Sequence, residues 1–193
     1  MVRGQLPEDG EVAGLLALML LTDSRRAARV TASGDLIPLD EQDRALWDGA
    51  LIDEGVALVR EAMTRSPLGP YQLQAAIAAC HATAGKAADT DWHEVHTLYL
   101  ILERIAPNPM VTLNRAVALS ELDGPRKGLD LLSTLDDDAR MTDHHRLHAV
   151  RAHLLEKAGE LAEAHASYRL AARGTASLAE RRYLESRAAR LPM

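Results

Sequence analysis

A repeat with a spacing of 36 residues is the feature that most constrains how this chain can fold. Each copy reads as a helix, a short turn and a second helix, within residues 109–172. Small residues lie where two antiparallel helices must approach closely, and large apolar residues fill the next layer. The matched positions are Ala116, Leu119, Gly128, Leu132 and Leu135 in the first copy and Ala152, Leu155, Ala164, Tyr168 and Ala171 in the second.

This pattern is typical of the tetratricopeptide repeat, whose period is about 34 residues. A single helix pair of this kind cannot bury its apolar face, so neighbouring pairs must stack on it. The sequence therefore predicts an all-α fold, with antiparallel helix pairs stacked into a short right-handed superhelix.

The helical pattern continues outside the two clear copies. Residues 69–107 read as an earlier, degenerate copy with a longer inner loop, in which Asp89 or Thr90 is expected to cap the second helix. The acid-rich residues 40–43 are expected to start the long helix before it. A charged helix from about 177 to 190 has the narrow apolar face of a capping helix.

These assignments give two parts, which we expect to form one continuous domain. Residues 1–66 are an N-terminal helical segment that packs on the repeats and is too long and too apolar to be a mere cap. Residues 67–193 hold the tetratricopeptide-like repeats and the C-terminal capping helix.

Composition excludes several functional classes. The net charge of −6 leaves no basic face of the kind that binds DNA or RNA, so this chain is not expected to contact nucleic acid directly. The longest apolar run, 15–21, is far too short to cross a bilayer, and no secretory leader opens the chain. A single cysteine fits a reducing compartment. We expect a cytoplasmic protein that does not interact with membranes.

No arrangement of side chains predicts catalysis, a cofactor or a metal. Cys80 and His81 are adjacent, but neighbouring helical side chains point about 100° apart and do not form a dyad. His144 with His148, and His93 with His96, have spacings that can chelate a metal, yet neither pair has the acidic partner of the metalloprotease helix. The glycines are scattered and form no phosphate-binding loop. We expect neither an enzyme nor a cofactor, and a metal- or ligand-sensing role for the histidines stays open as a lesser alternative.

Polar residues embedded in otherwise apolar helices are the candidate partner-binding positions. Arg115 and Arg151 lie one repeat apart, so they should occupy equivalent places on the first helices, which line the concave surface of such repeats. A ladder of this kind can hold an extended peptide by its backbone and carboxylates. Hydrogen bonds between neighbouring helices are an equally good explanation. The candidates are Gln72, Gln74, His81, Asn114, Arg115, His148 and Arg151.

The chain also resembles a known family over nearly all of residues 8–190. The resemblance is to the helical, tetratricopeptide-like C-terminal extension of bacterial extracytoplasmic-function sigma factors of the sigma-24-like group. The block 69–81 is its most specific part. The matching stretches are GLLALMLL (14–21), RR and AR (25–29), QDR and WD (42–48), GPYQLQAAIAACH (69–81), DTDW (89–92), LNRAVA (113–118), GP (124–125), HA and RA (148–152), and Gly159, Glu163, Ala164 and Tyr168.

The resemblance implies a regulatory domain of a transcription initiation factor. Such sigma factors carry a polymerase-binding region and a helix-turn-helix before this domain, and no segment of this chain is similar to either. We therefore expect a part of a longer bacterial protein that modulates initiation through contacts with the sigma regions, RNA polymerase or a signalling partner. A stand-alone tetratricopeptide-like adaptor unrelated to transcription is the alternative.

Overall fold

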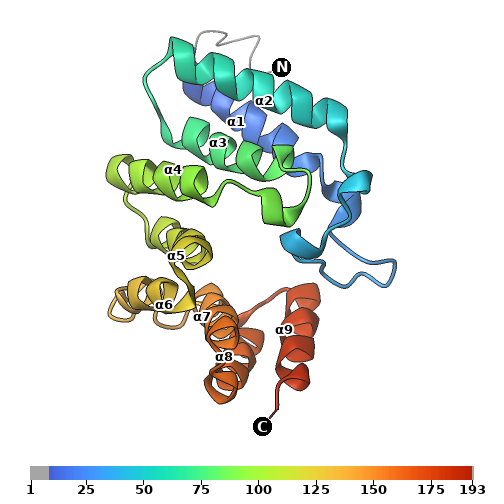
Figure 1. Cartoon of the computed structure of the whole chain (residues 1–193), viewed down its shortest axis with the longest axis vertical. Helices are drawn as coiled ribbons and strands as arrows, with labels where there is room; N and C mark the ends of the chain where they lie inside the picture. Colours follow the sequence, from blue (N-terminus) through green and yellow to red (C-terminus); the bar gives the residue numbers. More distant parts are fainter. Residues whose placement is uncertain (1–8, 193) are drawn as a thin grey trace. The chain divides into compact units, whose positions relative to one another are not determined.

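The computed structural model describes residues 9–192, and every regular element in that range is helical (Figure 1). This confirms the predicted all-α fold of helix pairs. Short 3-10 turns connect several of the helices. The α-helices are α1 (Gly10–Asp23), α2 (Gly49–Arg65), α3 (Pro70–Thr83), α4 (Trp92–Ile105), α5 (Pro109–Asp123), α6 (Pro125–Ser133), α7 (His145–Ala158), α8 (Leu161–Gly174) and α9 (Leu178–Arg190).

Contacts between the helices divide the described residues into two compact units. The first unit holds residues 9–30 and 37–107, and with them α1 to α4. The second holds residues 31–36 and 108–192, and with them α5 to α9. The sequence-based division at 66/67 stays a prediction; in the first unit α3 packs against α1, α2 and α4.

Helix α1 is the centre of the first unit, because α2 and α3 both pack along it (Figure 1). Small residues permit this approach: a Cβ atom on Gly14 would lie 2.6 Å from the backbone nitrogen of Gln72 in α3. On the side of α2, a Cβ on Gly55 would lie 2.7 Å from Leu21 Cγ. The broad apolar surface of α1 follows from this position between two helices.

The second long helix begins later than predicted. Asp48 is its N-cap, and the Asp48 carboxylate accepts the backbone N–H of Ala50 at 3.0 Å. Residues 40–43 lie instead in a segment of two 3-10 turns. The side chain of Gln42 is buried there and donates to the carbonyl of Ile37 at 3.0 Å. The predicted start at residues 40–43 was wrong, because the bond from Gln42 to Ile37 holds these residues outside the helix. Asp48, which directly precedes the helix, provides the N-cap instead.

The cap of α4 also differs from the prediction. Asp91 accepts the backbone N–H of Glu94 at 2.9 Å, as an N-cap does. Thr90 is buried, and Asp89 lies at the surface with its carboxylate 3.7 Å from Lys86 Nζ. Asp89, Thr90 and Asp91 all have side chains that can cap a helix. Because Thr90 is buried, Asp91 is the residue that lies at the helix start.

In the second unit the 36-residue repeat forms two helix pairs, α5 with α6 and α7 with α8. The small residues lie where the sequence predicted close approach. A Cβ on Gly128 would lie 2.7 Å from the carbonyl oxygen of Ala116, so α6 touches the backbone of α5. The matched residues Ala152 and Ala164 are both fully buried between α7 and α8.

Equivalent positions of the two copies touch each other. Glu121 in α5 and Lys157 in α7 are 36 residues apart, and Lys157 Nζ lies 2.6 Å from Glu121 Oε1. At the starts of the second helices, Arg126 pairs with Glu160. Helices α5 and α7 also contact each other directly. The first helices of successive copies therefore lie side by side, as the repeat predicts.

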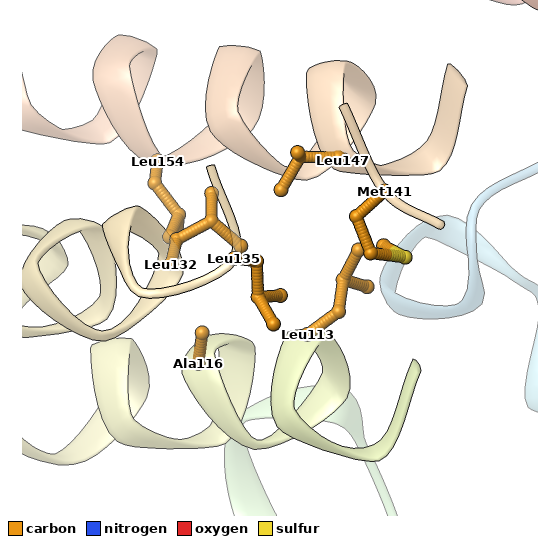
Figure 2. Packing of buried hydrophobic residues seen from close by; sticks show 7 residues of the cluster. All are labelled: Leu113, Ala116, Leu132, Leu135, Met141, Leu147 and Leu154. Atoms are coloured by element: carbon orange, nitrogen blue, oxygen red, sulfur yellow. The ribbon is translucent and has the colours of Figure 1, made fainter. Parts of the chain in front are cut away.

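The core of these copies is aliphatic (Figure 2). Leu113 and Ala116 of α5 face Leu147 and Leu154 of α7, and side chains from α6 and the following loop fill the space between. Every member of the cluster is at most 5% exposed. The loop contributes Leu135 and Met141, so residues between the copies also belong to the core.

A polar network joins the last helix to the second copy. The hydroxyl of the buried Tyr168 in α8 donates to Glu156 in α7 at 2.7 Å, and Arg187 Nη2 of α9 donates to the same Oε2 atom at 2.6 Å. These contacts hold the pKa of Glu156 below its usual value despite partial burial, which opposes the shift. The network fixes α9 on α8 in the place predicted for the capping helix.

Candidate functional site

The candidate partner-binding residues fall in both units. In the first unit they lie on α3, and in the second they lie on α5 and α7. The group on α3 is Gln72, Gln74 and His81, and the group on α5 and α7 is Asn114, Arg115, His148 and Arg151.

The two glutamines have opposite environments. Gln72 is fully buried, and its side-chain Nε2 donates to the carbonyl of Pro67 at 2.9 Å. Its backbone N–H donates to the Glu11 carboxylate of α1 at 3.1 Å. Gln74 is exposed, and its Nε2 donates to the carbonyl of Pro70 at 3.3 Å. A partner could therefore reach Gln74, whereas Gln72 ties α3 to α1 and to the loop before it.

His81 lies near the C-terminal end of α3 in a strongly basic environment. Its ring packs edge-on against the Trp92 indole, with centroids 5.3 Å apart. Burial, followed by the nearby positive charges of Arg25 and Arg44, lowers the pKa of His81 to about 4. His81 is thus a neutral imidazole at pH 7.

Arg44 organises the surroundings of His81. Its Nη1 donates to the carbonyl oxygens of His81 at 2.6 Å and Ala84 at 2.8 Å, at the C-terminal end of α3 where such groups lack partners. Its guanidinium carbon lies 4.4 Å from the centroid of the Trp47 ring. Arg25, Arg44 and Trp47 were not among the predicted partner-binding residues, although all three fall in stretches that carry the family resemblance.

In the second unit, the first helices carry an exposed Asn114 and a half-buried Arg115 on α5. Arg151 on α7 pairs with Asp136 of the loop between the copies. The pKa of His148 is lowered by burial and by the charge of Arg151, so that imidazole is also neutral at pH 7. Arg151 pairs with a residue of its own chain and is also partly exposed. Both a structural role and a role in partner binding are therefore compatible with its position.

The remaining reactive groups have ordinary structural environments. Burial, followed by the nearby Glu94, raises the pKa of the Cys80 thiol to about 12, which disfavours the nucleophilic thiolate. His144 is the N-cap of α7, and its ring stacks on His145 with centroids 4.9 Å apart. No group of three or more metal-ligating side chains converges within residues 9–192.

Helix α1 leaves part of its apolar surface uncovered. Met19 is 60% exposed, and with Leu16 and Leu20 it lines a hollow of about 440 Å³ whose rim includes Arg26 and Arg29. No helix in the part of the chain that the structure describes combines the length and apolarity needed to cross a membrane. An uncovered apolar surface with a charged rim is typical of a protein contact.

The pH dependence of stability tests the environment of His81. Its pKa is about 4 in the folded protein and about 6.5 in the unfolded chain, so the unfolded state binds more protons between these values. This contribution is complete above pH 6.5 and is lost as the pH falls toward 4, by up to about 3 kcal/mol. We expect His81→Asn to reduce the pH dependence of the free energy of unfolding in urea between pH 4 and pH 6.5.

An imidazole chemical-shift titration of the folded protein gives the direct measurement. His93 is exposed and provides an internal comparison in the same spectrum. A His81 midpoint near 6.5 would contradict the buried, positively charged environment described here.

Comparisons with known proteins place the chain beside relatives of undetermined function. Residues 1–63 match the model of DUF6596, a family of unknown function. An uncharacterized protein of Rhizobium meliloti (strain 1021) is 43% identical over 162 residues, which are 84% of this chain and 38% of that protein. The chain thus spans well under half the length of this curated relative. No solved structure matches the chain.

Proposed function

We propose that the chain is a regulatory protein-interaction domain of an alternative sigma factor. It would modulate transcription initiation through contacts with the sigma regions, RNA polymerase or a signalling partner. The observation that carries the interaction role is the direct pairing of equivalent repeat positions, Glu121 with Lys157. Stacked repeats of this kind present successive first helices side by side as a binding surface.

The side chains on that surface suit a peptide or an acidic partner. Asn114 is exposed on α5, and Arg151 keeps 26% of its side-chain surface on α7. Arginine and amide groups at repeated spacing can bind carboxylates and the backbone of an extended segment. The uncovered apolar surface around Met19 offers a second contact area in the first unit.

The family resemblance alone supports the transcriptional part of the proposal. Since the Rhizobium meliloti protein is more than twice as long as the matched region, the domain would act beside further segments of such a chain. DNA recognition would belong to those segments, in keeping with the net charge of −6 here. The proposal places the protein in the cytoplasm and assigns it no catalytic activity.

A capture experiment distinguishes the possible partners. The purified chain is immobilised and offered the sigma regions of the parent protein, core RNA polymerase, or cell lysate. Retention of the sigma regions or of core polymerase supports the proposal. Retention of neither, with a partner outside transcription recovered from lysate, would replace it with an adaptor function.

The paired arginines provide the corresponding mutational prediction. We expect Arg115→Ala with Arg151→Ala to weaken capture of the partner at least tenfold, because two donors of the proposed surface are removed. Arg146→Ala is a matched control, since Arg146 is exposed on α7 and lies outside the ladder.

A structural role of these arginines predicts a different result. Asp136→Asn removes the charge that pairs with Arg151 while keeping Arg151 itself. If Asp136→Asn and the double variant lose thermal stability alike and capture follows stability, Arg151 serves to hold the loop and not to bind a partner.

A further inference from the structure

The first unit contains a small, partly enclosed cavity of about 30 Å³ between α1, α3 and the segment before α2. Side chains that can donate hydrogen bonds contribute to its wall: Thr22, Arg25, Trp47 and His81. The rest of the wall is apolar and includes Leu21 and Leu39. The cavity thus combines polar donors with a partly apolar wall, beside which electrostatic interactions are stronger than in open solvent.

Arg25 is the charged member of this wall, and no carboxylate among residues 9–192 forms an ion pair with it. Burial lowers its pKa, and the positive charge of Arg29 adds to the shift. Within residues 9–192, no carboxylate or carbonyl accepts a hydrogen bond from the Arg25 guanidinium. A partly buried cation without an acceptor is unfavourable for the folded protein.

Two further donors near Arg25 also lack acceptors. Trp47 is only 9% exposed, and its enclosed indole N–H has no partner among the residues that the structure describes. The same holds for the buried Nε of Arg29, although its Nη2 donates to the carbonyl of Thr22. Buried donors are almost always satisfied, so an unsatisfied group of them needs an explanation.

The groups around Arg25 carry an excess of positive charge. Arg44 adds a second cation beside His81, and the carboxylate that offsets it, Asp89, acts on Arg44 and not on Arg25. His81 is neutral and supplies one more N–H group. The cluster therefore offers several hydrogen-bond donors and a net positive charge, and no carboxylate in the described part of the chain pairs with Arg25.

We propose that this cavity binds the carboxylate of an acidic side chain from the protein partner. Arg25 would hold the carboxylate through its planar pair of N–H donors, with Trp47 and His81 beside it. A cavity of about 30 Å³ takes roughly two water molecules, which suits a carboxylate and leaves too little room for a tetrahedral phosphate. This inference deepens the proposed function, because it names the chemistry of the partner.

Both tryptophans of the chain adjoin the cluster, so intrinsic fluorescence reports on it selectively. The purified protein is titrated with sodium acetate at pH 7 and constant ionic strength, with sodium chloride and inorganic phosphate as parallel series. We expect a saturable change with acetate alone, in the millimolar range, and a higher midpoint of thermal unfolding at saturation. No saturable response to acetate, or an equal or stronger response to phosphate, overturns the proposal.

Two adjacent arginines provide matched variants. Arg25→Gln should weaken acetate binding at least tenfold, while leaving the ligand-free protein as stable as the wild type or more so, since an unpaired buried charge is removed. Arg26→Gln should bind acetate as the wild type does, because Arg26 is 80% exposed and pairs with Asp23. Acetate binding by Arg25→Gln at wild-type strength overturns the assignment. If Arg25→Gln fails to fold, Trp47→Phe removes one donor, keeps the ring and should weaken acetate binding severalfold.

Partner capture completes the test. Arg25→Gln should lose capture of the partner where Arg26→Gln keeps it, and equal capture by both overturns the assignment of the carboxylate to the partner. The acetate titration needs no partner. If the wild-type chain binds acetate but captures neither sigma regions nor polymerase, it is the proposed function that fails.

Discussion

Replacing Gly14 by alanine is expected to lower the free energy of unfolding by about 3 kcal/mol. A Cβ at this position would lie 2.6 Å from the backbone nitrogen and 2.9 Å from the Cα of Gln72, and backbone atoms cannot move aside as a flexible side chain can. Helix α3 would have to shift away from α1. Urea unfolding followed by circular dichroism measures the loss.

Gly49→Ala is the control for this prediction. A Cβ on Gly49, at the start of α2, meets nothing within 4 Å, and alanine has the better helix propensity. We expect this variant to be as stable as the wild type or slightly more so. If Gly14→Ala behaves in the same way, α1 and α3 do not approach as closely as described.

Leu154→Ala should cost about 3 kcal/mol, because it removes a fully buried side chain from the core between α5, α6 and α7 (Figure 2). The neighbouring residues are buried and come from α5, α6 and the loop that follows, so the cavity cannot collapse completely. The loss should appear as a lower midpoint of urea unfolding with an unchanged dependence on urea concentration.

Leu170→Ala provides the comparison for Leu154. Leu170 is 49% exposed on α8, and its truncation should change the free energy of unfolding by less than about 1 kcal/mol. Similar losses for the two variants would mean that the cluster around Leu154 is not a core of the second unit.

The sequence predicted most of the second unit because its information is local and repeated. The 36-residue spacing identifies matched helix pairs, and the small residues Ala116 and Gly128 mark where two helices touch. The same reasoning located the capping helix near residues 177–190, which the structure places at Leu178–Arg190. These features depend on neighbours in sequence or on residues one repeat away.

The environments of individual polar side chains depend on tertiary contacts, which the sequence does not show. For Gln72 the sequence left partner binding and structural hydrogen bonding equally open, and in the structure its side chain is fully buried and donates to the Pro67 carbonyl. Arg25 and Arg26 look alike at the end of an apolar helix, and only the fold places one in a cavity and the other in solvent. The surroundings of His81 draw on separate segments, whose approach no local pattern predicts.

The Glu121–Lys157 pair also has a consequence for the order of the repeats. The first copy carries an acid and the second a base at the same position, so the two copies are not interchangeable. Duplicating the second copy would put two lysines side by side, whereas duplicating the pair of copies would keep the charges alternating. An exposed pair of this kind contributes only about 0.5 kcal/mol, but the sign of that contribution depends on the order. The ion pair thus favours the natural order of the two copies over a repetition of the second one.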